Sequence, residues 1–150
     1  MKIVVSPNPY RDKQFKNARQ ACSILREAGA EVALCLPFDV DKTFEIPHDL
    51  RFQDIQKEIK TADMLICFGG DGTILHSSKI ATEHNLPILG VNIGTMGFIA
   101  ELESGEIELL RRIPKGEYTV EERTMLDVSV GNGRQTIFHE TALNDAVITK

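Results

Sequence analysis

Short runs of apolar residues alternate with segments of helical spacing along the first 118 residues of the chain. The runs, typical of strands covered on both faces of a sheet, occupy residues 3–6, 31–36, 64–68 and 87–91. Apolar residues spaced three or four apart, as on one face of a helix, occupy residues 15–25, 55–62, 74–85 and 107–113. Ser104 is the expected N-cap of the last helix, and residues 38–50, which show no period, are predicted to form a loop. The alternation predicts an α/β fold, a Rossmann-like layered domain with a mainly parallel sheet.

The pattern changes near residue 118. Apolar and polar residues alternate over 126–130, a Gly-Asn-Gly turn follows at 131–133, and the alternation resumes at 136–139. This predicts a half-buried antiparallel hairpin, with another strand beginning within 142–149. We therefore expect an α/β domain over residues 1–118 and the start of a β-rich second domain over 119–150. Because the last predicted strand reaches the end of the sequence, we expect the chain to be a fragment.

Composition narrows the class of protein without identifying its chemistry. Hydrophobic residues make up 42% of the chain, charged residues make up 26%, and the formal net charge is −5, which disfavours a nucleic-acid partner. Phosphate-bearing ligands stay open, because backbone amides can bind them locally. No apolar stretch approaches the roughly 18 residues of a membrane span, so no membrane partner is expected. Three cysteines without a Cys-x-x-Cys pair and a short apolar start favour reduced thiols and a cytoplasmic location.

The strongest candidate for a chemical site is residues 68–73, Phe-Gly-Gly-Asp-Gly-Thr, between a predicted buried strand and a helix. Its glycines remove side chains that would block a phosphate chain, and the start of the helix favours an anion. A carboxylate in such a loop makes sense if Asp71 orients, or accepts a proton from, a hydroxyl that attacks phosphorus. The alternative is a tight turn with Asp71 as the N-cap of the helix.

Two further segments carry candidate ligand contacts. In residues 90–98, Gly94 and Gly97 would let backbone lie against a flat ligand and Phe98 could cover an adenine ring; alternatively the glycines only make turns and Phe98 is core. In residues 141–148, Asn144 could donate to and accept from an adenine edge, and Asp145 could accept from ribose hydroxyls. An Asn-Asp pair is also a common turn.

These motifs together resemble the NAD kinase family, over its N-terminal domain and the start of its C-terminal domain. Gly-Gly-Asp-Gly-Thr occurs in NAD kinases, in lipid kinases of the diacylglycerol and sphingosine type, and in 6-phosphofructokinases. Residues 90–98 match the NAD kinase form GxNxGxxGF, and residues 122–126 match its Glu-Arg-x-Met-Leu junction into the second domain. The elements expected of lipid kinases and phosphofructokinases are missing. One departure is Asp145, where many family members carry Glu.

The resemblance implies phosphoryl transfer from ATP, or polyphosphate, to the 2′-hydroxyl of the adenosine ribose of NAD, giving NADP. Asp71 would be the catalytic residue. The same resemblance implies that Mg²⁺ or another divalent cation arrives with ATP, and that the protein has no metal site of its own. The residues implied to bind phosphates are Gly69, Gly70, Gly72 and Thr73. The residues implied to bind NAD are Asp71, Gly72, His76, Phe98, Asn144 and Asp145.

Several alternatives and expectations accompany this interpretation. His76 could equally be an ordinary surface residue of its helix. The family's Thr-Pro-Thr-Gly-Ser-Thr-Ala-Tyr-like loop, which completes the NAD site, is missing, so we expect this chain alone to be weakly active or inactive. The complete protein is expected to be a homo-oligomer, a dimer or tetramer. The competing functions are a soluble lipid kinase and a nucleotide-binding sensor without turnover; Asp71 argues against the sensor, which needs no base.

Overall fold

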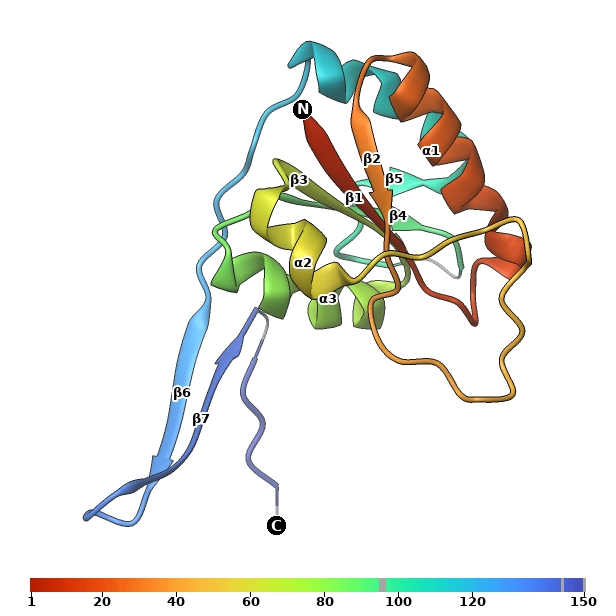
Figure 1. The fold of residues 1–150 in the computed structure, drawn as a ribbon. Helices are drawn as coiled ribbons and strands as arrows, with labels where there is room; N and C mark the ends of the chain where they lie inside the picture. The colour runs from red at the N-terminus through yellow and green to blue at the C-terminus, as the bar shows by residue number, and fades with distance from the viewer. Residues whose placement is uncertain (95–96, 144, 150) are drawn as a thin grey trace. The chain divides into compact units, whose positions relative to one another are not determined.

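The computed structural model describes residues 1–94, 97–143 and 145–149 (Figure 1). The backbone divides into two compact units, Met1–Tyr118 and Thr119–Lys150. Across the described ranges, every helix is too short or too polar to cross a membrane.

The first unit contains a five-stranded sheet in the order β2-β1-β3-β4-β5, with every neighbouring pair parallel. The strands are β1 (Lys2–Pro7), β2 (Glu31–Leu34), β3 (Met64–Gly69), β4 (Ile88–Asn92) and β5 (Leu102–Glu103). The predicted α/β fold with a mainly parallel sheet is confirmed. Because β3 lies between β1 and β4, the segments that follow these three strands meet at one edge of the sheet.

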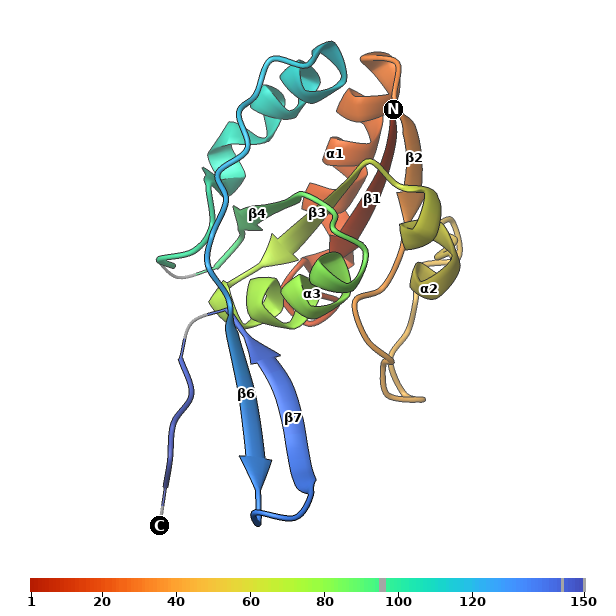
Figure 2. The same cartoon turned by 90° about the vertical axis from the view of Figure 1, so that its left-hand side faces the viewer.

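Helices cover both faces of this sheet, as Figure 2 shows from the side. They are η1 (Lys13–Phe15), α1 (Lys16–Glu27), α2 (Ile55–Glu58), η2 (Ile59–Thr61), α3 (Asp71–Glu83) and η3 (Ser104–Lys115), where η marks a 3-10 helix. One face packs against α1 and η3, and the other packs against α3 and the α2–η2 turn. Predicted helical stripes thus face the sheet from two sides.

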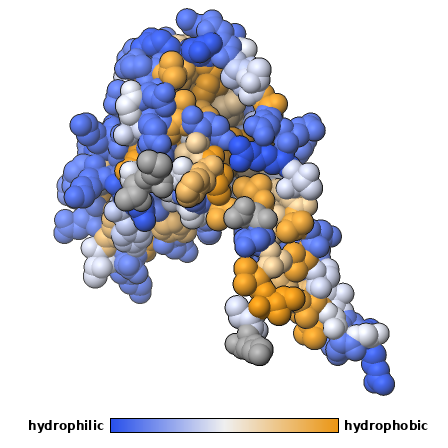
Figure 3. All heavy atoms as spheres, turned by 180° about the vertical axis from the view of Figure 1, so that it is seen from behind, coloured by the Kyte–Doolittle hydropathy of each residue, from blue (hydrophilic) through white to orange (hydrophobic). Residues whose placement is uncertain are grey.

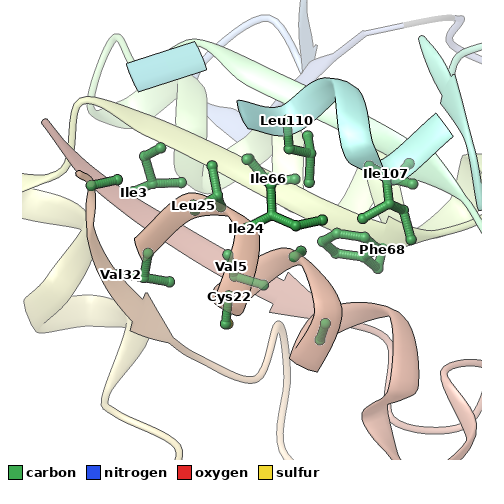
Figure 4. Close-up of a cluster of buried hydrophobic side chains, with 14 of the residues drawn as sticks. Ile3, Val5, Cys22, Ile24, Leu25, Val32, Ile66, Phe68, Ile107 and Leu110 are labelled. Atoms are coloured by element: carbon green, nitrogen blue, oxygen red, sulfur yellow. The ribbon is translucent and has the colours of Figure 1, made fainter. Parts of the chain in front are cut away.

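The core follows the two-residue alternation of side chains along each strand. Ile3, Val5 and Phe68 belong to the larger cluster under α1 and η3. Figure 4 shows side chains from α1, β3 and η3 meeting in this cluster. The intervening residues Val4 and Leu65 pack on the opposite face, in the cluster that includes Ala81 of α3. Strands buried on both faces explain why their sequences are continuous apolar runs.

The sequence predictions missed one strand and misplaced the end of β2 and the N-cap of η3. β5 was not predicted, because two residues are too few to show a period. The predicted strand 31–36 ends at Leu34, after which Cys35 forms an isolated bridge with Gln53. The N-cap of η3 is Glu103 rather than Ser104: the Glu103 backbone N–H donates to Glu106 Oε2 at 2.9 Å, within a reciprocal capping box.

The second unit contains an antiparallel hairpin of β6 (Leu126–Gly131) and β7 (Thr136–Ala142), as predicted. Its apolar side chains are more exposed than the half-buried pattern indicated, and Figure 3 shows them gathered along the hairpin. The exposed members are Leu126, Val130, Ile137 and Phe138. The strand predicted within 142–149 is wrong for the described residues, because β7 ends at Ala142 and residues 145–149 are irregular.

Candidate active site

A cleft of about 350 Å³ lies where β1, β3 and β4 end. Carboxyl ends of parallel strands are where α/β proteins bind ligands, because loops from neighbouring strands converge there. Three loops contribute: the one after β1, the turn between β3 and α3, and the one after β4. The lining residues are Asn8, Arg11, Gly70, Asp71, Gly72, Thr73 and Gly97.

The side chain of Thr73, in the first turn of α3, packs against the turn that joins β3 to α3. A Cβ on Gly69 would lie 2.2 Å from Thr73 Oγ1, so only glycine fits there. The Thr73 hydroxyl is buried and accepts a 2.9 Å hydrogen bond from Asn8 Nδ2. Thr73 therefore links the loop after β1 to the first turn of α3, while its own O–H can still donate.

Asp71 is the first residue of α3, and its side chain points away from its own helix. The N-cap is Gly70, so the alternative role of Asp71 as an N-cap is wrong. The Phe98 N–H donates to Oδ2 at 3.0 Å and to Oδ1 at 3.2 Å, and the Ile99 N–H donates to Oδ1 at 3.3 Å. A carboxylate offers about four acceptor positions, so these two donors orient Asp71 without exhausting it.

Gly97 approaches Asp71 so closely that a side chain has no room. A Cβ on Gly97 would lie 2.5 Å from Asp71 Oδ1 and 3.3 Å from its carboxyl carbon. The sequence suggested that this glycine admits a flat ligand, whereas the structure shows that it admits the carboxylate of Asp71. The loop after β4 thus packs against Asp71, which is the one acidic residue among the described residues that line the cleft.

The ring of Phe98 lies in solvent, with 92% of its surface exposed. The alternative that Phe98 is a core residue is therefore wrong. Its backbone N–H is held by Asp71, which keeps Phe98 next to the catalytic candidate. Of the other predicted NAD-binding residues, Gly72 lines the cleft, Asn144 lies outside the described residues, and Asp145 is an exposed residue of the second unit.

His76 lies on α3, about one turn after Asp71, and contacts the segment that follows β2. Its Nε2 lies 3.1 Å from the Pro37 carbonyl oxygen, so a hydrogen on Nε2 would donate to that oxygen. The imidazole also meets the Phe38 ring edge to face at 5.6 Å. Phe38 in turn stacks on Tyr10, whose hydroxyl donates to Asp41 Oδ2 at 3.0 Å. These contacts tie the predicted loop to α3 and to the loop after β1.

The sequence analysis missed Asn8 and Arg11, which line the cleft beside the glycine-rich turn. The available signal was their position directly after a buried strand, next to the Pro residues at 7 and 9 that stop it. This position indicates a role in the cleft only when β1 is known to lie next to β3 in the sheet.

The remaining reactive groups lie away from the cleft. Burial raises the pKa of the Cys22 thiol to about 11 and the pKa values of Cys35 and Cys67 to about 12. These thiols are therefore protonated near neutral pH. Among the residues that the structure describes, His, Cys, Asp and Glu form no group of three that could hold a metal ion.

Comparisons with known proteins match both the sequence and the fold. Residues 2–118 match the family model of the ATP-NAD kinase N-terminal domain. The chain is 30% identical to the NAD kinase of Acetivibrio thermocellus, over 100% of this chain and 51% of that protein. It is 44% identical to the NAD kinase of Natranaerobius thermophilus, over 65% and 34% respectively. The chain thus spans about half the length of the curated relatives that match nearly all of it.

A solved structure shares the fold at lower identity. The yeast NADH kinase complexed with NADH superposes with a TM-score of 0.70 at 20% sequence identity. The match covers 96% of this chain and 47% of that one.

Proposed function

Since this chain belongs to the NAD kinase family, we propose that it forms the donor-phosphate and catalytic half of an enzyme that makes NADP from NAD. The reaction is phosphoryl transfer from ATP, or polyphosphate, to the 2′-hydroxyl of the adenosine ribose of NAD. The observation that carries the proposal is the position of Asp71, a carboxylate oriented by two backbone amides inside a cleft next to a glycine-rich turn.

Asp71 accepts the hydrogen of the attacking hydroxyl through an acceptor position that the Phe98 and Ile99 amides leave open. Because the amides hold the carboxylate in one orientation, Asp71 both accepts the hydrogen and positions the hydroxyl oxygen for attack on phosphorus. Phosphates lie against Gly69, Gly70 and Gly72 and the first-turn amides of α3, with Thr73 near them. A Cβ at Gly70 or Gly72 would meet no atom within 4 Å, so no side chain stands between phosphate and backbone there, whereas the Thr73 side chain fills that space at Gly69.

The acceptor dinucleotide is bound through its adenine ring and its ribose. Phe98, exposed beside Asp71, offers an aromatic face to the adenine ring, and Gly72 lies at the cleft. The family resemblance adds Asn144 and Asp145 as residues that hydrogen-bond to adenine and ribose. His76 contacts the dinucleotide only if the Pro37 segment leaves room, because its Nε2 lies against that carbonyl.

The proposal extends to cofactor, assembly and location. Asp71 is the one carboxylate among the described cleft residues, so Mg²⁺ is carried by the donor phosphates rather than by a protein cage. Residues 1–118 form the nucleotide-binding domain, and residues 119–150 begin the NAD-binding domain. The complete protein is a cytoplasmic homo-oligomer without nucleic-acid or membrane partners. This chain by itself is weakly active or inactive.

The proposal is tested by NADP formation from NAD, Mg²⁺ and either ATP or polyphosphate. The assay compares the wild-type chain, Asp71→Asn and the matched control Asp39→Asn, an exposed aspartate away from the cleft. Loss of the base is expected to lower turnover about 10²- to 10⁴-fold, with Asp39→Asn unchanged. The same set is assayed in a fused chain that adds the C-terminal half of the Acetivibrio thermocellus NAD kinase.

The two formats separate a missing half from a wrong assignment. Turnover only in the fused chain would mean that the second half completes the site. Normal turnover in Asp71→Asn would refute the catalytic role of Asp71. Phosphorylation of diacylglycerol or a sphingoid base instead of NAD would refute the substrate.

A further inference from the structure

The Arg11 side chain extends from the loop after β1 toward the loop after β4. It follows β1, and its Nη1 lies 3.0 Å from the position that a Cβ on Gly94 would occupy. Gly94 follows β4, and β3 with its glycine-rich turn lies between β1 and β4 in the sheet. The guanidinium therefore lies over the edge of the sheet where the Gly70–Thr73 turn forms the cleft wall.

Arg11 forms no ion pair within the part of the chain that the structure describes. Arg19 pairs with Asp49 and Arg111 pairs with Glu108, but Arg11 is exposed and has no carboxylate partner there. Among the described residues that line the cleft, it is the one cation and Asp71 is the one anion.

The loop that carries Arg11 is held in place from both ends. Asn8 accepts from the Arg11 and Asp12 backbone amides and donates through its side chain to Thr73. The Asp12 carboxylate is buried and accepts from the backbone amides of Asn17 and Ala18 at 3.0 and 2.9 Å. Arg11 thus projects from a fixed backbone, which lowers the ordering cost of binding a ligand through it.

We propose that Arg11 binds the condensed phosphate chain that enters this cleft, an inference that rests on the proposed phosphoryl transfer. A polyphosphate carries several negative charges and is repelled by the carboxylate of Asp71. The guanidinium of Arg11, the one cation among the described lining residues, offsets that repulsion, and its forked donors match phosphate oxygens in pairs. The phosphate chain belongs either to the donor triphosphate or to the pyrophosphate of the dinucleotide.

The test measures binding by the 150-residue chain with isothermal titration calorimetry, using inorganic triphosphate, MgATP and NAD as separate probes. The variants are Arg11→Gln, which removes the charge, Arg11→Lys, which keeps the charge without the fork, and Lys13→Gln as the control. Lys13 lies two residues further on and lines a different hollow, with Phe15 and Phe44.

Arg11→Gln is expected to weaken triphosphate binding about ten- to a hundred-fold, the range for hydrogen bonds to charged groups. Arg11→Lys should lie between it and wild type, and Lys13→Gln should bind within about two-fold of wild type. An equal loss with Lys13→Gln, or no loss with Arg11→Gln for any of the three probes, overturns the role of Arg11 and leaves the proposed function standing. Wild-type chain that binds none of the three probes at millimolar concentration overturns the phosphate site itself.

The probes identify the source of the phosphate. Weakening confined to triphosphate and MgATP places Arg11 on the donor, and weakening confined to NAD places it on the dinucleotide; each supports the proposal. Because Arg11 is exposed, the variants should keep the wild-type thermal melting curve, which is recorded beside each titration.

Discussion

The carboxylate of Asp71 occupies the space that a side chain on Gly97 would need. A Cβ on Gly97 would lie 2.5 Å from Asp71 Oδ1, closer than any ordinary contact between such atoms. The backbone amide of the next residue, Phe98, then donates to both oxygens of the carboxylate. A glycine in one loop therefore sets the orientation of an acid in another.

Gly97→Ala is expected to displace Asp71 and weaken its bonds to the Phe98 and Ile99 amides. Overpacking of this kind costs about 1–3 kcal/mol of unfolding free energy. Misplacing a catalytic group by about 1 Å can cost roughly 10²-fold in rate. Hydrogen exchange of the Phe98 amide should accelerate in this chain, and turnover should fall in the fused chain with little change in KM.

The matched control is Gly105→Ala, since a Cβ there meets no atom within 4 Å. It should exchange and turn over like wild type. Combining Gly97→Ala with Asp71→Asn should cost no more turnover than Asp71→Asn alone, because the glycine acts through the carboxylate. Additive losses would show that Gly97 serves the ligand directly.

Asp12→Ala is expected to destabilise the first unit by about 2–4 kcal/mol. The buried carboxylate accepts from the Asn17 backbone and side-chain N–H groups and from the Ala18 N–H, and truncation leaves these donors unpaired. It also holds a turn in which Gln14 and Phe15 both have φ of 54°, a region that costs energy for residues with side chains. Urea unfolding followed by circular dichroism measures the change.

Asp12→Asn keeps one acceptor oxygen and should lose only part of that stability. An exposed carboxylate such as Asp39 should change the unfolding free energy by less than about 0.5 kcal/mol on replacement by alanine. Equal effects from Asp12→Ala and Asp39→Ala would contradict the anchoring role.

His76→Ala should loosen the segment after β2, because it removes the contacts with the Pro37 carbonyl and the Phe38 ring. The Asp41 amide, which donates to the Tyr10 hydroxyl, should exchange faster with solvent. Unchanged exchange together with weaker NAD binding would instead assign His76 to the dinucleotide. Glu83→Ala, a change at an exposed residue about two turns further along the same helix, serves as the comparison.

Alkaline pH should destabilise the folded chain through its buried thiols. Burial raises the pKa of Cys35 and of Cys67 from 9.0 to about 12, so the folded state keeps protons that the unfolded state releases above pH 9. Their contribution to stability is complete below pH 9 and is lost as the pH rises toward 12. At pH 10 the loss is roughly 1 kcal/mol per thiol.

Urea midpoints at pH 8 and pH 10 measure this loss. Cys67→Ala should be less stable than wild type at pH 8 but should lose less on going to pH 10. A pH dependence identical to that of wild type would exclude the Cys67 thiol as a cause.

The parallel sheet could be predicted because its strands are buried on both faces, which leaves unbroken apolar runs such as Met64–Gly69. The short β5 could not, since Leu102–Glu103 is defined only by pairing with β4. The strand expected within 142–149 failed for a related reason: an apolar, β-prone sequence such as that around Val147 still needs a neighbouring strand to complete its hydrogen bonds.

The site was predictable where adjacent residues share one turn, and not where it is assembled from separate loops. Gly69, Gly70 and Asp71 were identified from a single motif between a strand and a helix. Asn8 and Arg11 carry no comparable local pattern. Their relevance depends on β1 lying next to β3, which is a property of the sheet order.

The sequence by itself determined the α/β class, the glycine-rich turn and the presence of a carboxylate in it, because burial periodicity and local motifs are short-range properties of the chain. Only the tertiary structure decided what that carboxylate contacts. The amide that orients Asp71 lies 27 residues away, on a loop brought to it by the pairing of β3 with β4. The role of Gly97 follows from the same packing, since the space that a side chain would need is filled from a different strand end.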